Sequence, residues 1–87
     1  MSVWRFEITD TGKTDIENLD SQTRKRVLER IKWFSENFSH IAPLPLGAEW
    51  RGFFKLRAGN WRIVYKPDYQ NNRIVIHRVA PRDKVYR

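Results

Sequence analysis

The sequence predicts an α+β domain with the element order β-α-α-β-β-β, in which an antiparallel sheet packs on an N-terminal helix pair. Two observations carry this prediction. Apolar residues recur at helical spacing in the first half of the chain, whereas short alternating segments separated by turn residues fill the second half. With 87 residues, of which 40% are hydrophobic, the chain has material for one core and is expected to form a single domain over 1–87.

The chain is expected to begin with a strand and a short helix. Residues 3–8 alternate between two faces, which is typical of a half-buried strand. Thr14 and Glu17 have the spacing of a capping box, so a helix is expected from there to about Leu19. The apolar face of the strand is formed by Trp4, Phe6 and Ile8.

A longer amphipathic helix is expected over about 22–38, with Asp20-Ser21 as its N-cap. Its apolar stripe consists of Val27, Leu28, Ile31, Phe34 and Phe38. We interpret the charged side as a solvated face formed by Arg24, Lys25, Arg26, Glu29, Arg30, Lys32 and Glu36. Trp33 lies beside the stripe, where both core-edge packing and contact with a partner fit its position.

Turn residues divide the rest of the chain into a loop and three strands. Two prolines and a glycine predict the loop over 41–47, because they break both the helical and the strand period. Gly59-Asn60 and the segment 67–72 supply the turns between strands. The three strands are expected over 50–57, 61–66 and 73–80.

The positive charge is concentrated in the last part of the chain. Residues 1–48 carry seven basic and seven acidic side chains, whereas residues 49–87 carry ten basic and three acidic ones, which accounts for the whole net charge of +7. A folded basic region with interleaved aromatic residues indicates a surface for the phosphates of nucleic acid. A basic face that binds an acidic protein is the alternative, and an acidic partner could also mask a nucleic-acid site.

Composition excludes several classes of site. The absence of cysteine excludes disulfides, thiolate metal sites and cysteine nucleophiles, and only two histidines are present. We therefore expect no metal and no other cofactor. No apolar run approaches the roughly 20 residues that span a bilayer, and the N-terminus lacks the apolar segment of a signal peptide. A soluble, cytoplasmic protein without membrane contact is expected.

The predicted strands bring basic side chains together. Alternation over 50–57 places Arg51, Lys55 and Arg57 on one face. A two-residue loop would set Arg62 opposite Lys55 or Arg57, whereas a three-residue loop would turn it to the other face. Because like charges that face each other are destabilising unless an anion lies between them, this pattern suggests a phosphate site. Three solvated cations spread over the sheet are the alternative.

Neither histidine is expected to be catalytic. His77 lies in the middle of a predicted strand between Val75 and Val79, and we interpret it as a packed, hydrogen-bonded side chain. His40 follows the predicted long helix, where a cation suits the helix dipole.

Three segments of the second half resemble the RelE branch of the RelE/ParE toxin superfamily: residues 54–57, 59–65 and 78–87. The resemblance covers essentially the whole chain, because a strand followed by a helix pair is also this family's layout. Members are toxins of bacterial type II toxin–antitoxin modules. The resemblance implies a RelE-like, microbial-ribonuclease-type fold. RelE-branch toxins cleave translated mRNA in the ribosomal A site without a metal, and a small antitoxin neutralises them. ParE-branch toxins instead poison DNA gyrase and lack the basic cleavage residues.

The resemblance implies a role for each matching residue. Lys55 matches a catalytic lysine and Arg57 a phosphate-binding arginine. Arg62 matches the arginine that stabilises the transition state, Arg82 the one that assists the leaving group, and Tyr86 the tyrosine that positions the RNA. Further contacts to RNA are expected from Arg51, Arg78 and Arg87.

Two positions depart from the family pattern. Phe53 stands where some members have a first lysine, which leaves Lys55 as the sole lysine candidate for the base. Pro81 stands where many members have a histidine, and it is expected to restrict the backbone at Arg82. Weaker activity or a changed sequence preference would follow from either difference.

The chemistry of RNA cleavage fits this residue set. RNA carries its own nucleophile, the ribose 2′-hydroxyl, so the site has to align it, remove its proton and stabilise the phosphoryl charge. Arginines stabilise phosphoryl oxygens well because the guanidinium is a fixed, bidentate donor. For Arg82 we therefore favour charge stabilisation over proton donation. Such a site would be weak on free RNA, which fits dependence on the ribosome.

The first hypothesis is therefore a ribosome-dependent mRNA endonuclease toxin, with the ribosome, mRNA and an acidic, partly disordered antitoxin as partners. Two alternatives from other classes stay open. One is a non-nuclease inhibitor of gyrase that resembles ParE, and the other is a non-catalytic RNA-binding module.

Overall fold

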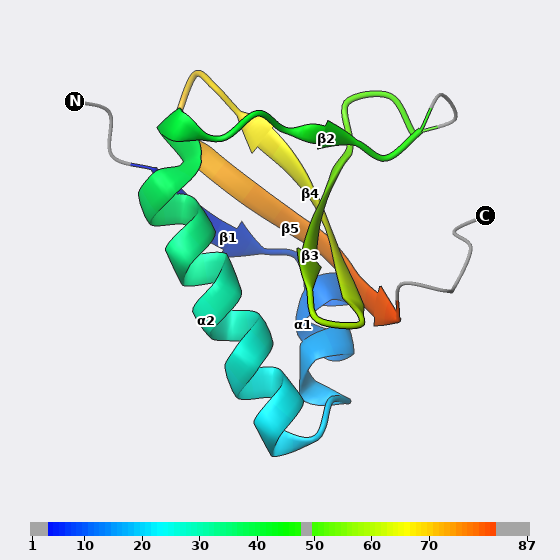
Figure 1. The fold of residues 1–87 in the computed structure, drawn as a ribbon. Coiled ribbons are helices and arrows are strands. Elements are labelled where there is room, and N and C mark those ends of the chain that lie inside the picture. The colour runs from blue at the N-terminus through cyan, green and yellow to red at the C-terminus, as the bar shows by residue number, and fades with distance from the viewer. Residues whose placement is uncertain (1–3, 48–49, 82–87) are drawn as a thin grey trace.

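The computed structural model describes residues 4–47 and 50–81, which form a five-stranded sheet and two α-helices (Figure 1). This confirms the predicted α+β class. The strands are β1 (Arg5–Ile8), β2 (Leu44–Pro45), β3 (Phe54–Ala58), β4 (Trp61–Asp68) and β5 (Arg73–Pro81). The helices are α1 (Asp10–Glu17) and α2 (Ser21–Asn37), and α2 is followed by the short 3₁₀ helix η1 (Phe38–His40).

The strand order in the sheet is β1-β5-β4-β3-β2. Strands β3, β4 and β5 pair antiparallel, as their short connections predict. Strand β1 runs parallel to β5, so the expectation of a purely antiparallel sheet was wrong. A parallel neighbour is reached through a long crossover rather than a turn, and no local sequence pattern indicates such a pairing.

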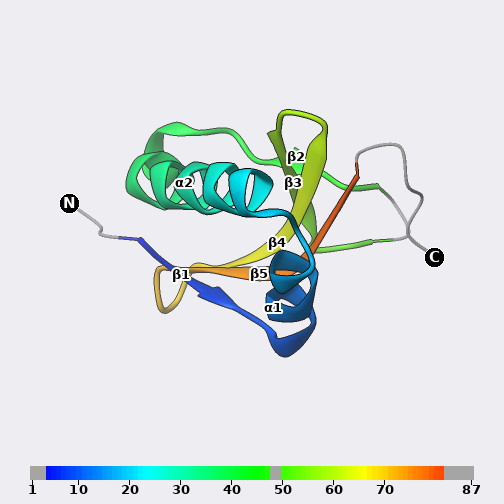
Figure 2. The ribbon, with the colours of Figure 1, turned by 90° about the horizontal axis from the view of Figure 1, so that it is seen from below.

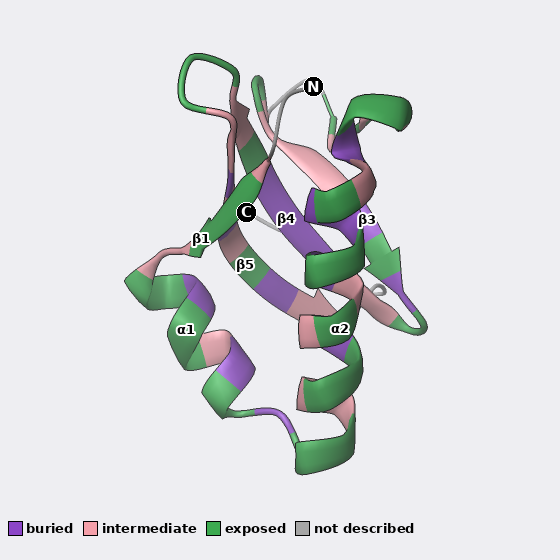
Figure 3. Cartoon of the chain, turned by 90° about the vertical axis from the view of Figure 1, so that its left-hand side faces the viewer, coloured by how far each residue is buried: buried purple, intermediate pink, exposed green. Residues whose placement is uncertain are grey.

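Helix α2 covers one face of the sheet, and α1 lies beside β5 (Figure 2). The core forms where α2 meets β3, β4 and β5, and Figure 3 marks the buried positions of these elements in purple. It includes Val27, Ile31, Phe34, Leu56, Ile63, Tyr65, Ile74 and Ile76. Within the described ranges no helix covers the opposite face, which we call the open face. Neither helix there is long and apolar enough to cross a membrane.

Strand β5 contains an irregularity in its pairing with β4. Arg78 pairs with Val64 of β4, whereas Ile76 pairs with the next residue of that strand. His77 is therefore an extra residue on β5, as in a β-bulge. Because of it, Ile76 and Val79 both reach the core although they are three residues apart. Bulges of this kind re-aim side chains and are frequent beside active sites.

Helix α1 begins four residues before the predicted cap. Its N-cap is Thr9, whose hydroxyl oxygen accepts a hydrogen bond from the Gly12 amide at 3.1 Å. Thr14 lies inside the helix, where its hydroxyl donates to the Asp10 carbonyl, so the capping box at Thr14 was wrong. For α2 the predicted Asp20 cap is confirmed, since its carboxylate accepts from the Thr23 amide at 3.1 Å.

Arg24 holds the junction between the two helices. Its guanidinium donates to the backbone carbonyls of Ile16, Glu17 and Leu19 at 2.8–3.2 Å. These carbonyls belong to the end of α1 and the link to α2, where backbone acceptors lack helical partners. Arg24, near the start of α2, therefore caps the C-terminal end of α1. The interpretation that it belongs to a solvated face was wrong.

The strand expected from residue 50 begins only at Phe54. Residues 50–52 form a turn in which Gly52 has a positive φ of 82°, a conformation that other residues rarely adopt. The segment predicted as a loop contains the two-residue strand β2, in which Leu44 pairs with Lys55. Two residues are too few to show the alternation of apolar and polar side chains by which a strand is predicted.

The hairpin between β3 and β4 has a two-residue loop, one of the two lengths that the sequence left open. Ala58 pairs with Trp61, and the loop residue Gly59 has a φ of 61°. Glycine with positive φ at the first loop position is the signature of a type II′ turn. This loop length sets Arg62 opposite Arg57 and places both on the open face.

Helix α1 closes the edge of β5 beyond the end of β1. The Thr9 amide donates to the Ile76 carbonyl, and the Asp15 carboxylate accepts from the Val79 amide at 2.9 Å. Gly12 permits this approach, because a Cβ there would lie 2.9 Å from the Ile76 carbonyl oxygen. The edge of β5 is thus covered rather than open to pairing with another strand.

Replacing Gly12 with alanine is therefore expected to destabilise the protein, although alanine is the better helix former. The added methyl group collides with backbone, which cannot move aside cheaply, and overpacking of this kind costs about 1–3 kcal/mol. Urea unfolding followed by circular dichroism measures the loss. The exposed neighbour Lys13→Ala serves as the control and should change stability by less than about 0.5 kcal/mol. Equal stability of the two variants would contradict the close contact.

Candidate functional site

The open face carries a ring of basic side chains around Val64. Val64 is only 2% exposed, although no helix of the described residues covers this face, so the side chains around it exclude water. The sheet register places these residues on three neighbouring strands. We call this group the basic face; it consists of Lys55 and Arg57 from β3, Arg62 and Lys66 from β4, and His77 and Arg78 from β5.

Arg57 and Arg62 bring two like charges together on the basic face. They are directly opposite in the β3–β4 ladder, where like charges destabilise each other. The Nε atom of Arg62 is buried and has no hydrogen-bond partner among the described residues. None of the ion pairs in the described ranges involves either side chain. A buried, unpaired donor beside a second guanidinium is the arrangement that an anion such as a phosphate completes.

The backbone at Arg57 is fixed from the helix side. Its carbonyl oxygen accepts a hydrogen bond from the Arg30 Nε atom at 3.1 Å, at the β3 edge beyond the short β2 pairing. The Arg30 guanidinium also lies 4.5 Å from the ring centre of Trp33. Trp33, which is 45% exposed, therefore supports the residue that anchors β3, in addition to presenting a surface to solvent.

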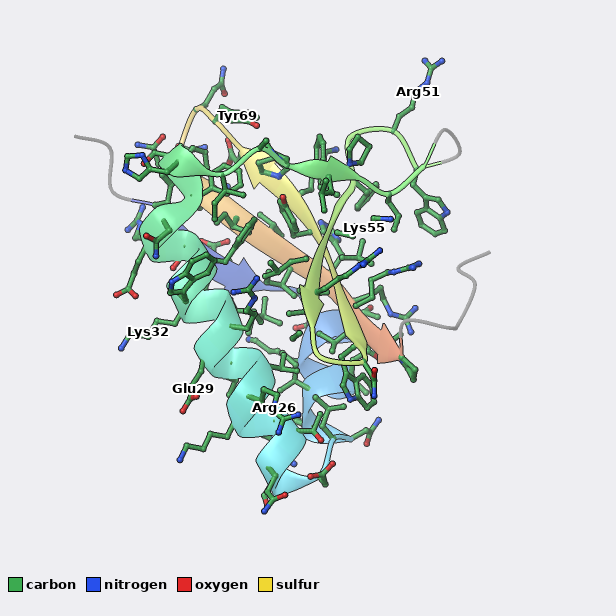
Figure 4. The ribbon with its side chains drawn as sticks, in the orientation of Figure 1. Arg26, Glu29, Lys32, Arg51, Lys55 and Tyr69 are labelled. Carbon is green, nitrogen blue, oxygen red and sulfur yellow. The ribbon has the colours of Figure 1, made fainter. Side chains whose placement is uncertain are left out.

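Lys55 lies in the same row of the sheet as Val64 and Arg78. It lies on β3 (Figure 4), where strand alternation puts it on the same face as Arg57, as predicted. Arg51, which was expected to share this face, lies on the turn before β3 and points away from the sheet (Figure 4). The strand position predicted for Arg51 was wrong, because the turn at Gly52 interrupts the alternation. A contact of Arg51 with RNA stays a prediction.

Arg78 differs from the other arginines of the basic face in having a carboxylate partner. Its Nε atom lies 2.8 Å from Asp15 Oδ2, the same oxygen that accepts from the Val79 amide. Asp15 thus balances part of the charge of Arg78 and fixes β5 against α1. The predicted site residues Arg82, Tyr86 and Arg87 lie outside the described residues, so their roles stay predictions.

His77 is packed but is not the hydrogen-bonded histidine that its strand position predicted. Its ring meets the edge of Phe53 with 5.0 Å between ring centres, and it makes no side-chain hydrogen bond within the described ranges. Lys66 Nζ lies 5.6 Å from the centre of the Phe53 ring. Burial, and secondly the charge of Lys66, lower the pKa of His77 below its ordinary value. The sequence does not predict this arrangement, because the bulge that orients His77 produces no recognisable pattern in the residues around it.

The Arg57–Arg62 pair predicts specific stabilisation by a doubly charged anion. Inorganic sulfate should raise the melting temperature more than chloride at equal ionic strength, because a ligand at ten times its Kd adds about 1.4 kcal/mol, or about 6 °C for a domain of this size. Differential scanning fluorimetry measures the shift. The variant with Arg57→Gln and Arg62→Gln should lose this increment and keep only the general salting effect of sulfate. An identical increment in both proteins would contradict an anion site at this pair.

Comparison with known proteins identifies relatives of the whole fold. Residues 6–86 match the family model described as the ParE toxin of the type II toxin–antitoxin system parDE. A search of curated proteins gave no significant match.

Several solved structures are similar over nearly the full length. A chain of the toxin–antitoxin complex RelBE2 from Mycobacterium tuberculosis is 27% identical with a TM-score of 0.81, covering 93% of this chain and 100% of that one. A chain of the RelE–RelB complex from the archaeon Pyrococcus horikoshii is 18% identical with a TM-score of 0.73, at 97% and 100% coverage. The isolated E. coli RelE toxin is 15% identical with a TM-score of 0.73, at 94% and 87% coverage.

Proposed function

Since the chain belongs to the ParE toxin family of type II toxin–antitoxin systems, within the RelE/ParE superfamily, we propose that it is a toxin that cleaves translated mRNA on the ribosome. The observation that carries this proposal is the Arg57–Arg62 pair, with its buried and unpaired Arg62 Nε. By resemblance, toxins that act on gyrase lack these basic cleavage residues. Among the described residues, Lys55, Arg57 and Arg62 are present here and lie on the open face of the sheet.

In this proposal the basic face holds the phosphate that is cut. Arg62 donates to a non-bridging oxygen and stabilises the charge that develops on it, while Arg57 binds from the opposite strand. Lys55 adds a third positive charge in the neighbouring row of the sheet. Arg82 and Tyr86 are proposed to act at the leaving oxygen and on a splayed base, respectively. Because the ribose 2′-hydroxyl is the nucleophile and arginines stabilise the phosphoryl charge, we propose a reaction without a metal.

A second candidate function is inhibition of DNA gyrase. The match to a family model described as a ParE toxin favours it. The two functions require different things of the basic face. A nuclease needs an accessible phosphate site at Arg57 and Arg62, whereas a gyrase inhibitor needs only a surface that fits its target.

An antitoxin is the proposed regulatory partner. Support comes from the solved relatives, several of which are complexes of a RelE toxin with RelB. The net charge of +7 on this chain favours an acidic partner, and a partly disordered segment could fold onto the basic face and exclude RNA. Translated mRNA as substrate would place the free toxin in the cytoplasm.

Primer extension on a message that is being translated in a reconstituted system tests the proposed function. The purified toxin should produce new 5′ ends on ribosome-bound mRNA, and far fewer on the same RNA without ribosomes. A supercoiling assay with purified gyrase runs in parallel. Uncut message together with inhibited supercoiling would overturn the nuclease function in favour of the second candidate. Binding to RNA with neither effect would leave a non-catalytic RNA-binding protein.

A further inference from the structure

We propose that His77 is the general base of the cleavage reaction, the group that takes the proton from the ribose 2′-hydroxyl. This inference rests on the proposed cleavage of mRNA by the basic face. It adds a residue that the resemblance does not supply, since the family pattern points to lysine for this role. Its support comes from the position of His77 in the sheet, the freedom of its imidazole nitrogens and the charges around it.

The bulge in β5 places His77 within the ring of side chains around Val64. Arg78, the next residue, pairs directly with Val64, and Lys55 pairs with Val64 from the other side. Directly opposite residues on neighbouring strands have Cβ atoms about 5 Å apart, and diagonal neighbours about 7–8 Å. Arg62 pairs with Ala80, three residues beyond His77 on β5, so about 10 Å of strand separates His77 from the row of Arg57 and Arg62. The long guanidinium side chains would have to span that distance toward a phosphate held beside His77.

The imidazole is both accessible and held in place. His77 lines a surface hollow of about 410 Å³ together with Lys66, Val75 and Tyr69, so substrate atoms can reach it. The Phe53 ring packs on its other side. Neither ring nitrogen makes a hydrogen bond to another described residue, which leaves a lone pair available. Phe53, which replaces a lysine found in some relatives, thus acts as a support for the histidine.

The charges around His77 keep it in the form that a base needs. Lys66 on β4 is the cation whose charge acts on His77, Arg78 is the next residue of β5, and Asp68 lines the same hollow. The nearby carboxylates are already bound, Asp15 of α1 to Arg78 and Asp68 to Arg73. Phe53 and its neighbour Trp50 bring no charge to this site. Tyr69 lines the hollow as well. Burial, and secondly the charge of Lys66, disfavour the imidazolium, so the pKa of His77 is lowered and the neutral form, which can accept a proton, is favoured.

The proposed step conserves atoms and charge. The 2′-oxygen attacks the adjacent phosphorus while its proton passes to His77, and the bond from phosphorus to the 5′-oxygen breaks. The products are a 2′,3′-cyclic phosphate and a 5′-hydroxyl, whose proton comes from solvent or from the imidazolium formed in the first half of the reaction. No oxidant, reductant or further reactant is needed.

The pH dependence of single-turnover cleavage tests this role. With toxin in excess over ribosome-bound mRNA, the wild-type rate should rise with pH and then level off, and the midpoint of the rise should lie below the ordinary pKa of histidine. His77→Gln should lower the rate by about 10²- to 10⁴-fold and remove this rise. His40→Gln replaces the other histidine, which is exposed on η1, and should leave both the rate and the profile unchanged.

A second variant separates proton transfer from a structural role. His77→Ala leaves space for a small molecule, so added imidazole should restore part of the rate in proportion to the fraction of neutral imidazole. A loss caused by misfolding would not respond, and thermal unfolding of each variant checks that the fold is kept. If wild type cleaves but His77→Gln keeps its rate and profile, or if imidazole rescues nothing, His77 is not the base. If wild type itself fails to cleave, the proposed function falls first.

Discussion

Replacing Arg62 with alanine is expected to reduce cleavage of ribosome-bound mRNA by about 10²- to 10³-fold, the usual cost of removing one preorganised donor to a developing oxyanion. The side chain lies directly opposite Arg57, and its buried Nε has no partner among the described residues. It is therefore set to bind an anion that the free protein lacks. Single-turnover primer extension measures the loss.

The stability of the Arg62→Ala variant distinguishes this explanation from simple damage to the fold. Removing one of two facing guanidinium groups relieves repulsion, so the melting temperature should be unchanged or higher. Lys32→Ala is the matched control, because it removes one positive charge from the exposed side of α2 (Figure 4). Full activity of Arg62→Ala, or an equal loss in Lys32→Ala, would contradict a specific phosphate site at Arg62.

The cleavage rate is expected to depend on a positive charge at position 55 rather than on a group there that can accept a proton. If His77 removes the proton, Lys55 contributes a positive charge beside the phosphate, which an arginine can supply but a methionine cannot. Lys55→Met should therefore lose about 10²-fold or more, as expected for a lost charge contact in the transition state. Lys55→Arg should stay within roughly tenfold of wild type, since it keeps the charge although not the shape. Measured rates for both variants at pH 7 test this difference.

The opposite pattern would assign the base to Lys55. Arginine stays protonated in proteins and cannot accept a proton, so Lys55→Arg would then be as inactive as Lys55→Met. His77→Gln would in that case retain the pH profile of wild type. The two sets of variants therefore decide between lysine and histidine without reference to any relative.

The local parts of the fold could be predicted from the sequence. The β3–β4 hairpin was predicted from its glycine–asparagine turn and two alternating segments, but its loop length stayed open, and the structure decides for the register that sets Arg57 opposite Arg62. The long helix and its Asp20 cap were likewise visible, since both depend on residues close in sequence. At Thr14 the same capping pattern was misleading, because packing of Gly12 against β5 favours the earlier start at Thr9.

The parts that depend on distant segments could not be predicted. The parallel pairing of β1 with β5 joins residues 68 positions apart, such as Arg5 and Arg73, and the bulge at His77 depends on how β4 and β5 fit over the core. Arg24 looked like one of many charged helix residues, and only the position of α1 makes it a partner for three carbonyls. The arginine pair was thus one of the arrangements that the sequence allowed, whereas the placement of His77 by the bulge was not visible in it.

The central claim is that the basic face cuts RNA by activating the substrate's own 2′-hydroxyl. The most direct test compares two ribosome-bound messages that differ only by a single 2′-deoxynucleotide on the 5′ side of the mapped cleavage position. Wild-type toxin should cut the all-ribose message there, leave a 2′,3′-cyclic phosphate, and fail to cut the deoxy message at that position. Cutting of both messages at the same rate would show that another nucleophile attacks the phosphate, and would contradict the claim.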